Sequence, residues 1–432
     1  MAQTQGTDWG QFQGEASHQG SLASGPEPPY RLAWRFRAPR GTVSGPVVHG
    51  DQVVTVGTHA VIGVDLGTGR QAWSLDRSGG PIAMPAIATV KGKPAVLFTD
   101  GSTKPGAALV AVALSDRTEL WRAALKASSR SGIAVEGGTA YLADDDGNVY
   151  AIALSDGSVS WTGTTLGEVQ APPAVADGRV FVTGRDTQNQ HSELVAFDAA
   201  TGRRLWVYAP SVAGSTSSGP SVADGAVITG FADRSIHAFS AQDGIERWSH
   251  LALSLFSPAT APAAGPDGAY LIDVAGGLYR LDPATGRRLW DYQLNDLVVR
   301  SAPVVSGNAV LVGLNDGQLA AVDRSSADLV WESRPSPGLI GPIAVTGDTI
   351  VASKGGHAPG LVAFAHDDQG TLLSVPSPTR LKPVELFGTY AIAAAIVLAI
   401  FLLPGRLAAT RIGPPSWEAW EDVEDGHDEG AP

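Results

Sequence analysis

The 432-residue sequence contains no cysteine. Disulfide bonds and thiolate chemistry are therefore excluded. Positive charge is also scarce, because 30 lysines and arginines stand against 43 aspartates and glutamates, which gives a net charge of -13. This balance argues against nucleic acid as a partner.

Several motifs of catalysis and metal binding are also missing. The nine histidines show neither His-x-His nor His-Glu-x-x-His spacing, so the sequence predicts no zinc site. It has no Gly-x-Ser-x-Gly elbow, and the string GGHAPG at 355–360 has neither the lysine nor the following helix of a phosphate loop. The members of a Ser-His-Asp triad can lie far apart, so that alternative stays open.

A tryptophan-ended string of eleven residues recurs instead. AFDAATGRRLW at 196–206 and RLDPATGRRLW at 280–290 are nearly identical, and a degenerate copy without tryptophan, AFAHDDQGTLL, lies at 363–373. The repeated tryptophans are 39 to 48 residues apart, which is the period of a propeller blade. They are Trp34, Trp73, Trp121, Trp161, Trp206, Trp248, Trp290 and Trp331.

Each repeat predicts four short strands. In one unit, the apolar runs at 221–223, 226–229, 236–239 and 246–249 are separated by turn residues, and helical periodicity is absent. Seven units open with a proline, and an eighth opens with Ser131-Gly132-Ile133. Proline is tolerated at the first residue of a strand because no ladder N–H is needed there. The openings are Gly45-Pro46, Met84-Pro85, Pro172-Pro173, Gly219-Pro220, Ala261-Pro262, Ala302-Pro303 and Gly341-Pro342.

The two ends of the repeat region complement each other. The strand expected at 32–37 carries Trp34 but has no three strands before it, whereas the last unit, 341–365, has three strands and no tryptophan. We therefore expect an all-β, eight-bladed propeller over 31–365, in which the N-terminal strand closes the last blade. The alternative is that 371–375 forms that fourth strand itself.

The repeats resemble the PQQ-type repeat family of eight-bladed propellers, and most closely its non-enzymatic BamB-like branch. The signature Ala-x-Asp-x-x-Thr-Gly-x-x-x-Trp is most complete in the units that contain Gly69, Gly202 and Gly286, and residues 8–20 look like a family lead-in segment. The resemblance implies that each tryptophan packs between blades against the Thr-Gly turn of a neighbour. We therefore interpret the eight tryptophans and these three glycines as structural residues that dock the blades.

The segments outside the propeller suggest a membrane anchor. Residues 1–30 form the lead-in and contain no apolar signal-peptide core. After a linker at 366–383, the uncharged stretch 386–403 predicts a transmembrane helix over 384–404, and an acidic tail occupies 405–432. Flanking positive charges are equal in number, so they leave the orientation open. The single apolar stretch predicts a single-pass membrane protein. Its propeller is either cytoplasmic, with a tail anchor, or extracytoplasmic after removal of a signal peptide, and the family resemblance favours the extracytoplasmic location.

The function expected from this reading is a non-catalytic scaffold that binds another protein, with no cofactor and no metal. Residues Leu255, Phe256 and Arg300 are candidates for the interaction, on the same face as the long loops 99–108 and 184–193. Asp144 to Asn148 could suggest a calcium loop, but turns occupy the same position in other units. The alternative function is a membrane-bound PQQ-dependent dehydrogenase, which the resemblance implies would hold its quinone with calcium on the propeller axis.

Overall fold

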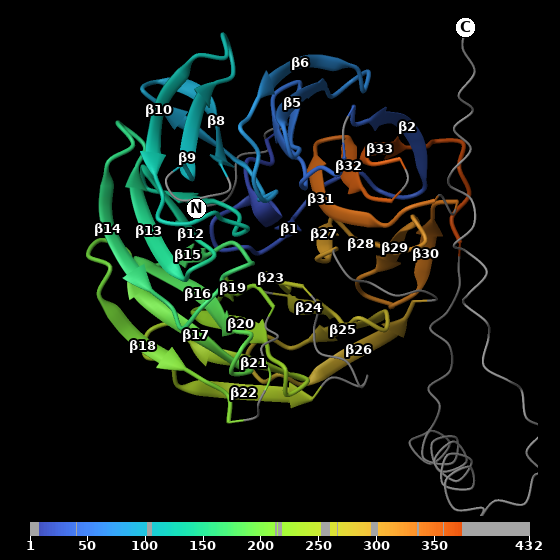
Figure 1. Ribbon diagram of the computed structural model, residues 1–432. Coiled ribbons are helices and arrows are strands. Elements are labelled where there is room, and N and C mark those ends of the chain that lie inside the picture. Colours follow the sequence, from blue (N-terminus) through green and yellow to red (C-terminus); the bar gives the residue numbers. More distant parts are fainter. Residues whose placement is uncertain are drawn as a thin grey trace, which may run out of the picture. The chain divides into compact units, whose positions relative to one another are not determined.

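The computed structural model describes residues 8–39, 41–101, 106–211, 214, 218–251, 260–265, 267–294, 301–334, 337–356 and 358–373. Eight antiparallel sheets lie round a common axis, so the expected eight-bladed all-β propeller is confirmed (Figure 1). In the described residues the one helical element is the 3-10 turn η1 (Phe12–Gly14). The outer strand of blade 2 alternates buried and exposed residues over its second half, and its neighbouring middle strand is buried throughout, as expected for sheets that are covered by neighbouring sheets on both faces.

Within each blade, the strands follow one another outward from the axis. Blade 1 contains β3 (Val47–His49), β4 (Gln52–Val56), β5 (Ala60–Asp65) and β6 (Gln71–Asp76), and blade 2 contains β7 (Ala86–Val90), β8 (Lys93–Asp100), β9 (Ala108–Ala113) and β10 (Glu119–Ala124). Blade 3 contains β11 (Ala134–Glu136), β12 (Thr139–Ala143), β13 (Asn148–Ala153) and β14 (Val159–Thr164), and blade 4 contains β15 (Ala174–Ala176), β16 (Arg179–Asp186), β17 (His191–Asp198) and β18 (Arg204–Tyr208).

The second half of the ring repeats this order. Blade 5 contains β19 (Ser221–Ala223), β20 (Ala226–Gly230), β21 (Ser235–Ser240) and β22 (Glu246–Leu251), and blade 6 contains β23 (Ala263–Gly265), β24 (Gly268–Ile272), β25 (Gly277–Leu281) and β26 (Arg288–Gln293). Blade 7 contains β27 (Val304–Ser306), β28 (Ala309–Gly313), β29 (Leu319–Asp323) and β30 (Leu329–Glu332), with β1 (Ser21–Leu22) added parallel to β27. Blade 8 contains β31 (Ile340–Thr346), β32 (Thr349–Lys354), β33 (Gly360–His366) and β2 (Tyr30–Arg37).

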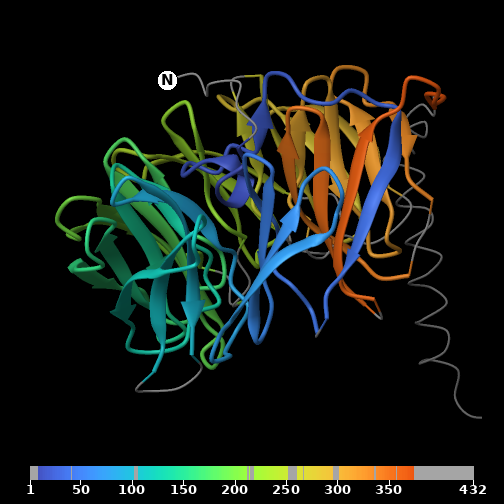
Figure 2. The same cartoon turned by 90° about the horizontal axis from the view of Figure 1, so that it is seen from above.

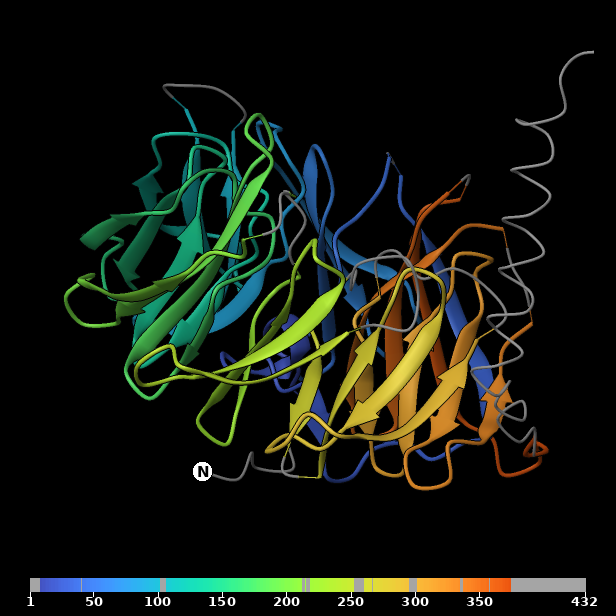
Figure 3. The same ribbon diagram turned by 90° about the horizontal axis from the view of Figure 1, so that it is seen from below.

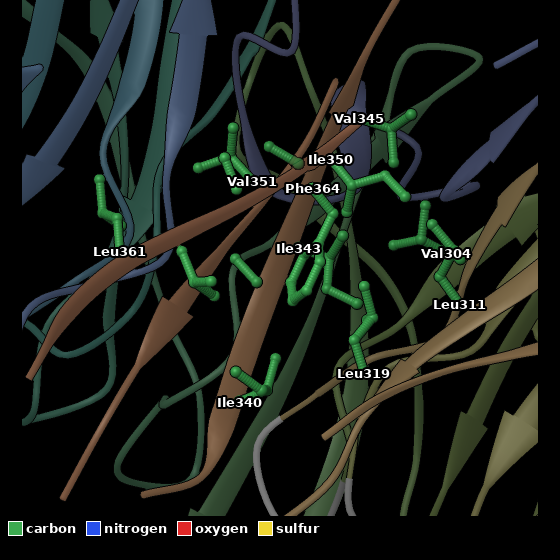
Figure 4. Close-up of a cluster of buried hydrophobic side chains, with 14 of the residues drawn as sticks. Val304, Leu311, Leu319, Ile340, Ile343, Val345, Ile350, Val351, Leu361 and Phe364 are labelled. Atoms are coloured by element: carbon green, nitrogen blue, oxygen red, sulfur yellow. The ribbon is translucent and has the colours of Figure 1, made fainter. Parts of the chain in front are cut away.

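The N-terminal strand closes the ring, as the sequence predicts. Strand β2 pairs antiparallel with β33, and Trp34 lies opposite Ala363 in this pairing. The alternative closure by 371–375 is wrong, because 371–373 form no strand and the amide of Leu373 instead donates to the carbonyl of Val330 on blade 7. A core cluster of aliphatic side chains from blades 7, 8 and 1 surrounds this closure, and Figure 4 shows Ile343 and Phe364 within it.

We name the two faces of the ring by their turns. The CD face carries the turns between the third and fourth strands of each blade, such as 66–70, and the first-to-second turns, such as 50–51. The BC face carries the second-to-third turns, such as 144–147, and the connections between blades. Figures 2 and 3 view the ring from its side, where the strands run between these two faces.

The lead-in segment runs round the axis near the CD face and pairs with the innermost strands. Seven blades each direct one inner-strand amide toward it, and every one of these amides finds an acceptor within the segment. An innermost strand has a second strand on one side only, so these donors would otherwise be an unpaired sheet edge. The donors are Val48, Ile87, Val135, Val175, Val222, Ala264 and Val305; the acceptors, in the same order, are carbonyls of Trp9 and Gly10, the Gln11 side chain, and carbonyls of Ala16, Ser17, Gln19 and Gly20.

The same geometry explains the prolines that open the blades. Backbone groups of residues two apart on a strand point to the same side, so Pro220 faces the axis as Val222 does. Proline brings no N–H to that position, and its carbonyl accepts a hydrogen bond from His18 Nδ1 at 3.1 Å. In the same way, Gln13 Nε2 donates a hydrogen bond to the carbonyl of Pro262 in the next blade at 3.0 Å.

Residues 379–432 form a second unit of the chain, separate from residues 1–378. The stretch 386–403 that predicts a transmembrane helix lies outside the described residues, as do the acidic tail and most of the linker. Within the described part of the chain, no helix has the length and apolar character needed to span a bilayer.

Candidate interaction face

The repeated tryptophans lie between blades at the CD face. The indole N–H of Trp34 donates to the carbonyl of Leu66 in blade 1 at 2.7 Å, and its ring covers Gly69. Gly69 has a φ of 69°, and a Cβ on it would lie 2.6 Å from the Trp34 ring, so both conformation and space require glycine. The same arrangement holds for Trp161 over Gly202, Trp248 over Gly286, Trp121 over Gly157 and Trp206 over Gly244.

The other three tryptophans have different partners. Trp73 lies under the guanidinium of Arg117, 4.5 Å from the ring centre, and its N–H donates to Gln52 rather than to a turn carbonyl. Arg117 has a positive φ of 64°, so it takes the left-handed position that glycine holds elsewhere. Trp290 donates to the carbonyl of Arg324, and the ring of Trp331 packs edge-on against Tyr30 and Phe364.

A funnel of about 510 Å³ lies on the axis toward the BC face. Phe12 of the lead-in segment belongs to its lining, and its walls are the small residues that precede the first strand of the blades. Arg130 and Lys354 are the titratable groups among its described lining residues, which include no aspartate or glutamate. The small wall residues are Gly45, Gly132, Gly219, Ala261, Ala302 and Gly341.

The funnel's described lining does not fit a calcium-held quinone. Calcium takes six to eight oxygen ligands, usually with carboxylates among them, and the lining offers no carboxylate. Asp144, from the loop that suggests calcium, is fully buried and uses both oxygens within its own turn and strand: it accepts from the amide of Asn148 at 2.9 Å and from the hydroxyl of Tyr150 at 2.7 Å. The loop therefore acts as a turn of the fold.

Such buried aspartates recur at second-to-third-strand turns, and sequence reasoning missed their role. Asp273 Oδ2 accepts from the hydroxyl of Tyr279 at 2.6 Å in blade 6, as Asp144 does from Tyr150 in blade 3. In blade 5 the partner of Asp233 is His237, at 3.0 Å. An aspartate in the turn followed four to six residues later by tyrosine or histidine is the sequence signal that could have revealed these pairs.

Ion pairs link blades 3 and 4 on the BC face. Arg130 lies 2.8 Å from Asp145 and 3.3 Å from Glu168, and Arg185 lies 3.1 Å from the same Glu168. Burial alone would raise the pKa of Glu168, but hydrogen bonds from Gln170 and Arg185 and the two arginine charges outweigh it and lower the pKa. This carboxylate therefore stays charged and holds the rim of the funnel in place.

The tallest described hairpin of the BC face belongs to blade 4. Strands β16 and β17 are eight residues long, against five for β12 in blade 3, and the hairpin reaches beyond its neighbours (Figure 3). Its tip is ordered by Asp186, whose Oδ1 accepts from the amides of Gln188 and Asn189. A hydrogen bond from the amide of Gly214 to the carbonyl of Gln190 ties the tip to the chain that enters blade 5. Residues 187–190 are exposed.

The other candidate residues, Leu255, Phe256 and Arg300, lie outside the described residues, as do residues 102–105 between β8 and β9. The described ends of that hairpin show a fixed base: Asp100 accepts from the amide of Ser78 at 2.7 Å and from Arg122 at 3.0 Å, and Arg77 lies 4.0 Å away.

Comparisons with known proteins agree with this geometry. A family model described as outer membrane protein assembly factor BamB matches residues 29–104, 105–250 and 189–371. The chain is 28% identical over 313 residues to the outer membrane protein assembly factor BamB of Burkholderia pseudomallei, a match that covers 65% of this chain and 72% of that protein.

Two solved structures share the fold. The crystal structure of BamB from Moraxella catarrhalis superposes with a TM-score of 0.61 at 17% identity, over 78% of this chain and 100% of that chain. Quinohemoprotein alcohol dehydrogenase from Comamonas testosteroni reaches a TM-score of 0.67 at 12% identity, over 92% of this chain and 86% of that chain. At these identities both similarities speak for the propeller fold alone.

Proposed function

Since this chain belongs to the family of the outer membrane protein assembly factor BamB, we propose that it is a non-catalytic propeller that binds another protein during assembly of an envelope or membrane complex. The relative from Burkholderia pseudomallei is named for outer membrane protein assembly, which supports this proposal. We further propose that the stretch 386–403 anchors the chain in a membrane as a single helix and that the propeller is extracytoplasmic, as the family resemblance implies.

The observation that carries the proposal is the difference between the two faces. The lead-in segment pairs with the inner strands of seven blades, and at the CD face five tryptophans dock over glycine turns of a neighbouring blade, so these residues serve the ring itself. At the BC face, the blade 4 hairpin rises from an ion-paired base and presents four exposed polar residues, 187–190. An ordered, raised loop on a rigid scaffold is a common site of protein recognition. We assign the eight tryptophans and their glycines to the scaffold, and the BC face to the partner.

A site-specific photocrosslinker tests the assignment. With the reactive residue at Gln188, on the exposed tip of the BC-face hairpin, we expect one dominant protein adduct in cells or native membranes. The matched control places the same residue at Arg203, which is exposed on the CD face of the same blade. Equal adducts from both positions, or an adduct from Arg203 alone, would contradict the proposed face.

The enzymatic alternative has a separate test. The carboxylate-free funnel predicts that the protein reconstituted with the quinone and calcium retains no stoichiometric cofactor after gel filtration and reduces no dye with alcohols or sugars. Retained quinone together with turnover would show that the chain is a dehydrogenase.

A further inference from the structure

A groove of about 570 Å³ separates the outer parts of blades 7 and 8. Strand β2 contributes Arg31, Leu32 and Arg35 to its lining, and Arg334 follows β30 on the other side. Lys354 lies at the end of β32 and also lines the groove. Both walls are firmly held, because Tyr30 packs against Trp331 and β2 closes the ring.

The groove is lined by more positively charged side chains than negatively charged ones. Arg31, Arg35 and Arg334 are exposed, and none of their side chains forms an ion pair or hydrogen bond within the described part of the chain. Elsewhere on the propeller, by contrast, Arg77, Arg122, Arg130 and Arg185 are paired with carboxylates. The acids that line the groove are Glu332 and Asp367, against four cations. An excess of arginines in a protein of net charge -13 marks a site suited to an anion.

The cations also act on one another. Burial lowers the pKa of Lys354, and the positive charge of Arg35 lowers it further. Arg35 therefore adds to the positive potential of the groove. The three arginine side chains offer planar donor forks to an anion such as a phosphate, which guanidinium groups bind in bidentate fashion.

The described part of the chain ends beside this groove, because the amide of Leu373 donates to the carbonyl of Val330 on β30. From Leu373 to the apolar stretch at 386 the chain can extend over at most roughly 45 Å. Two exposed apolar side chains lie in the same region: Leu32, at 42% exposure, and Leu372, at 54%.

We propose that this groove binds the phosphate headgroups of anionic phospholipids in the membrane that holds residues 386–403. The inference rests on the proposed membrane anchoring. Arg31, Arg35 and Arg334 bind the phosphates, and Leu32 and Leu372 contact the apolar boundary of the lipid layer. The contact would fix the propeller against the bilayer on its blade 7 and 8 side.

The test measures lipid binding by the full chain in detergent with native mass spectrometry. Phosphatidylglycerol is titrated against phosphatidylcholine for the wild type, for the groove variant Arg31→Gln/Arg35→Gln/Arg334→Gln, and for a control variant Arg70→Gln/Arg203→Gln/Arg287→Gln. The control removes three exposed arginines from turns of the CD face, so the net charge changes equally. We expect the groove variant to bind phosphatidylglycerol about a hundredfold more weakly, from about fivefold for each of its three arginines, while the control retains wild-type affinity.

Three results would overturn the inference. Equal phosphatidylglycerol affinity of the two variants would exclude the groove. Displacement of the lipid by glycerol phosphate at equal concentration would identify a free-phosphate site, and tighter binding of an acidic peptide through the same arginines would identify a protein site. Alkaline carbonate extraction tests the membrane anchor separately from the groove. If carbonate releases the chain from the membrane but the groove still binds phosphatidylglycerol, the anchor is refuted and the lipid site is retained.

Discussion

The buried histidine of the lead-in segment predicts a specific loss of stability in acid. His18 is completely buried and donates from Nδ1 to the carbonyl of Pro220, whereas its Nε2 has no hydrogen-bond partner. A charged imidazolium would leave that second N–H unpaired in an apolar site, beside the ring of Phe12 at 5.0 Å. Burial accordingly lowers the pKa of His18 to about 4, and the hydrogen bond to Pro220 offsets only part of this effect.

The sign and size of the effect follow from linkage. In the unfolded chain His18 titrates near its ordinary pKa of 6.5, so between pH 6.5 and 4 unfolding takes up a proton. The stability that His18 contributes is therefore fully present above pH 6.5 and is lost as the pH falls toward 4. The full loss corresponds to about 3 kcal/mol, at about 1.4 kcal/mol for each unit of the pKa difference.

The variant His18→Asn isolates this contribution. His18 has a positive φ of 60°, which asparagine tolerates better than most residues, and the asparagine amide can donate to Pro220 in place of Nδ1. Urea unfolding followed by tryptophan fluorescence at pH 7.5, 6, 5 and 4 gives the free energy of unfolding of both proteins. The free energy of unfolding of the wild type, relative to that of His18→Asn, should fall by about 3 kcal/mol between pH 7.5 and pH 4. Burial also raises the pKa of Glu15, but Glu15 is present in both proteins. Parallel curves would refute the reasoning.

Two further predictions concern the ring. Gly202→Ala should destabilise the protein by about 1 to 3 kcal/mol more than Gly178→Ala. Both glycines have a φ near 70°, but an added Cβ meets the Trp161 ring, at 2.6 Å, only at position 202. Equal urea midpoints of the two variants would exclude the indole contact as the cause. Gln11→Ala should lower the free energy of unfolding by about 1 to 2 kcal/mol. It should also speed hydrogen exchange of the Val135 amide, which donates to Gln11 Oε1 at 2.8 Å. Unchanged exchange at that amide would contradict the pairing role of the segment.

The sequence predicts the ring well because its signals repeat. Trp34 stands one period before Trp73, and the last unit lacks both a tryptophan and a fourth strand, so closure by the N-terminal strand follows from counting. The strands at 221–223 and 246–251 begin where the turn residues place them, and β22 extends two residues beyond its expected end. Periodic side-chain patterns predict strands because successive side chains of a strand point to opposite faces of the sheet, so that buried and exposed positions alternate.

The contacts of the lead-in segment leave no comparable signal. Six of its seven acceptors are main-chain carbonyls, which every residue type offers, so the sequence between 9 and 20 shows no pattern to recognise. The Gln11 side chain, which pairs with Val135 on both its amide and its carbonyl, takes the place of backbone in the remaining case. The groove of blades 7 and 8 is hidden for another reason: Arg31 and Arg334 are 303 residues apart and meet only because the ring closes.

The two faces of the propeller differ in how much sequence change they can accept. At the CD face, six of the eight tryptophans donate a hydrogen bond to a carbonyl of the next blade's turn, and Gly69 or Gly202 cannot change without disturbing a neighbour. At the BC face, β16 and β17 extend to eight residues while blade 4 keeps the four-stranded order of the other blades, so a longer hairpin there costs the ring little. Loops that vary without cost to the fold are the places where recognition can be built. The position of the blade 4 hairpin on this face is therefore the reason to seek the protein partner there, away from the segment that closes the axis.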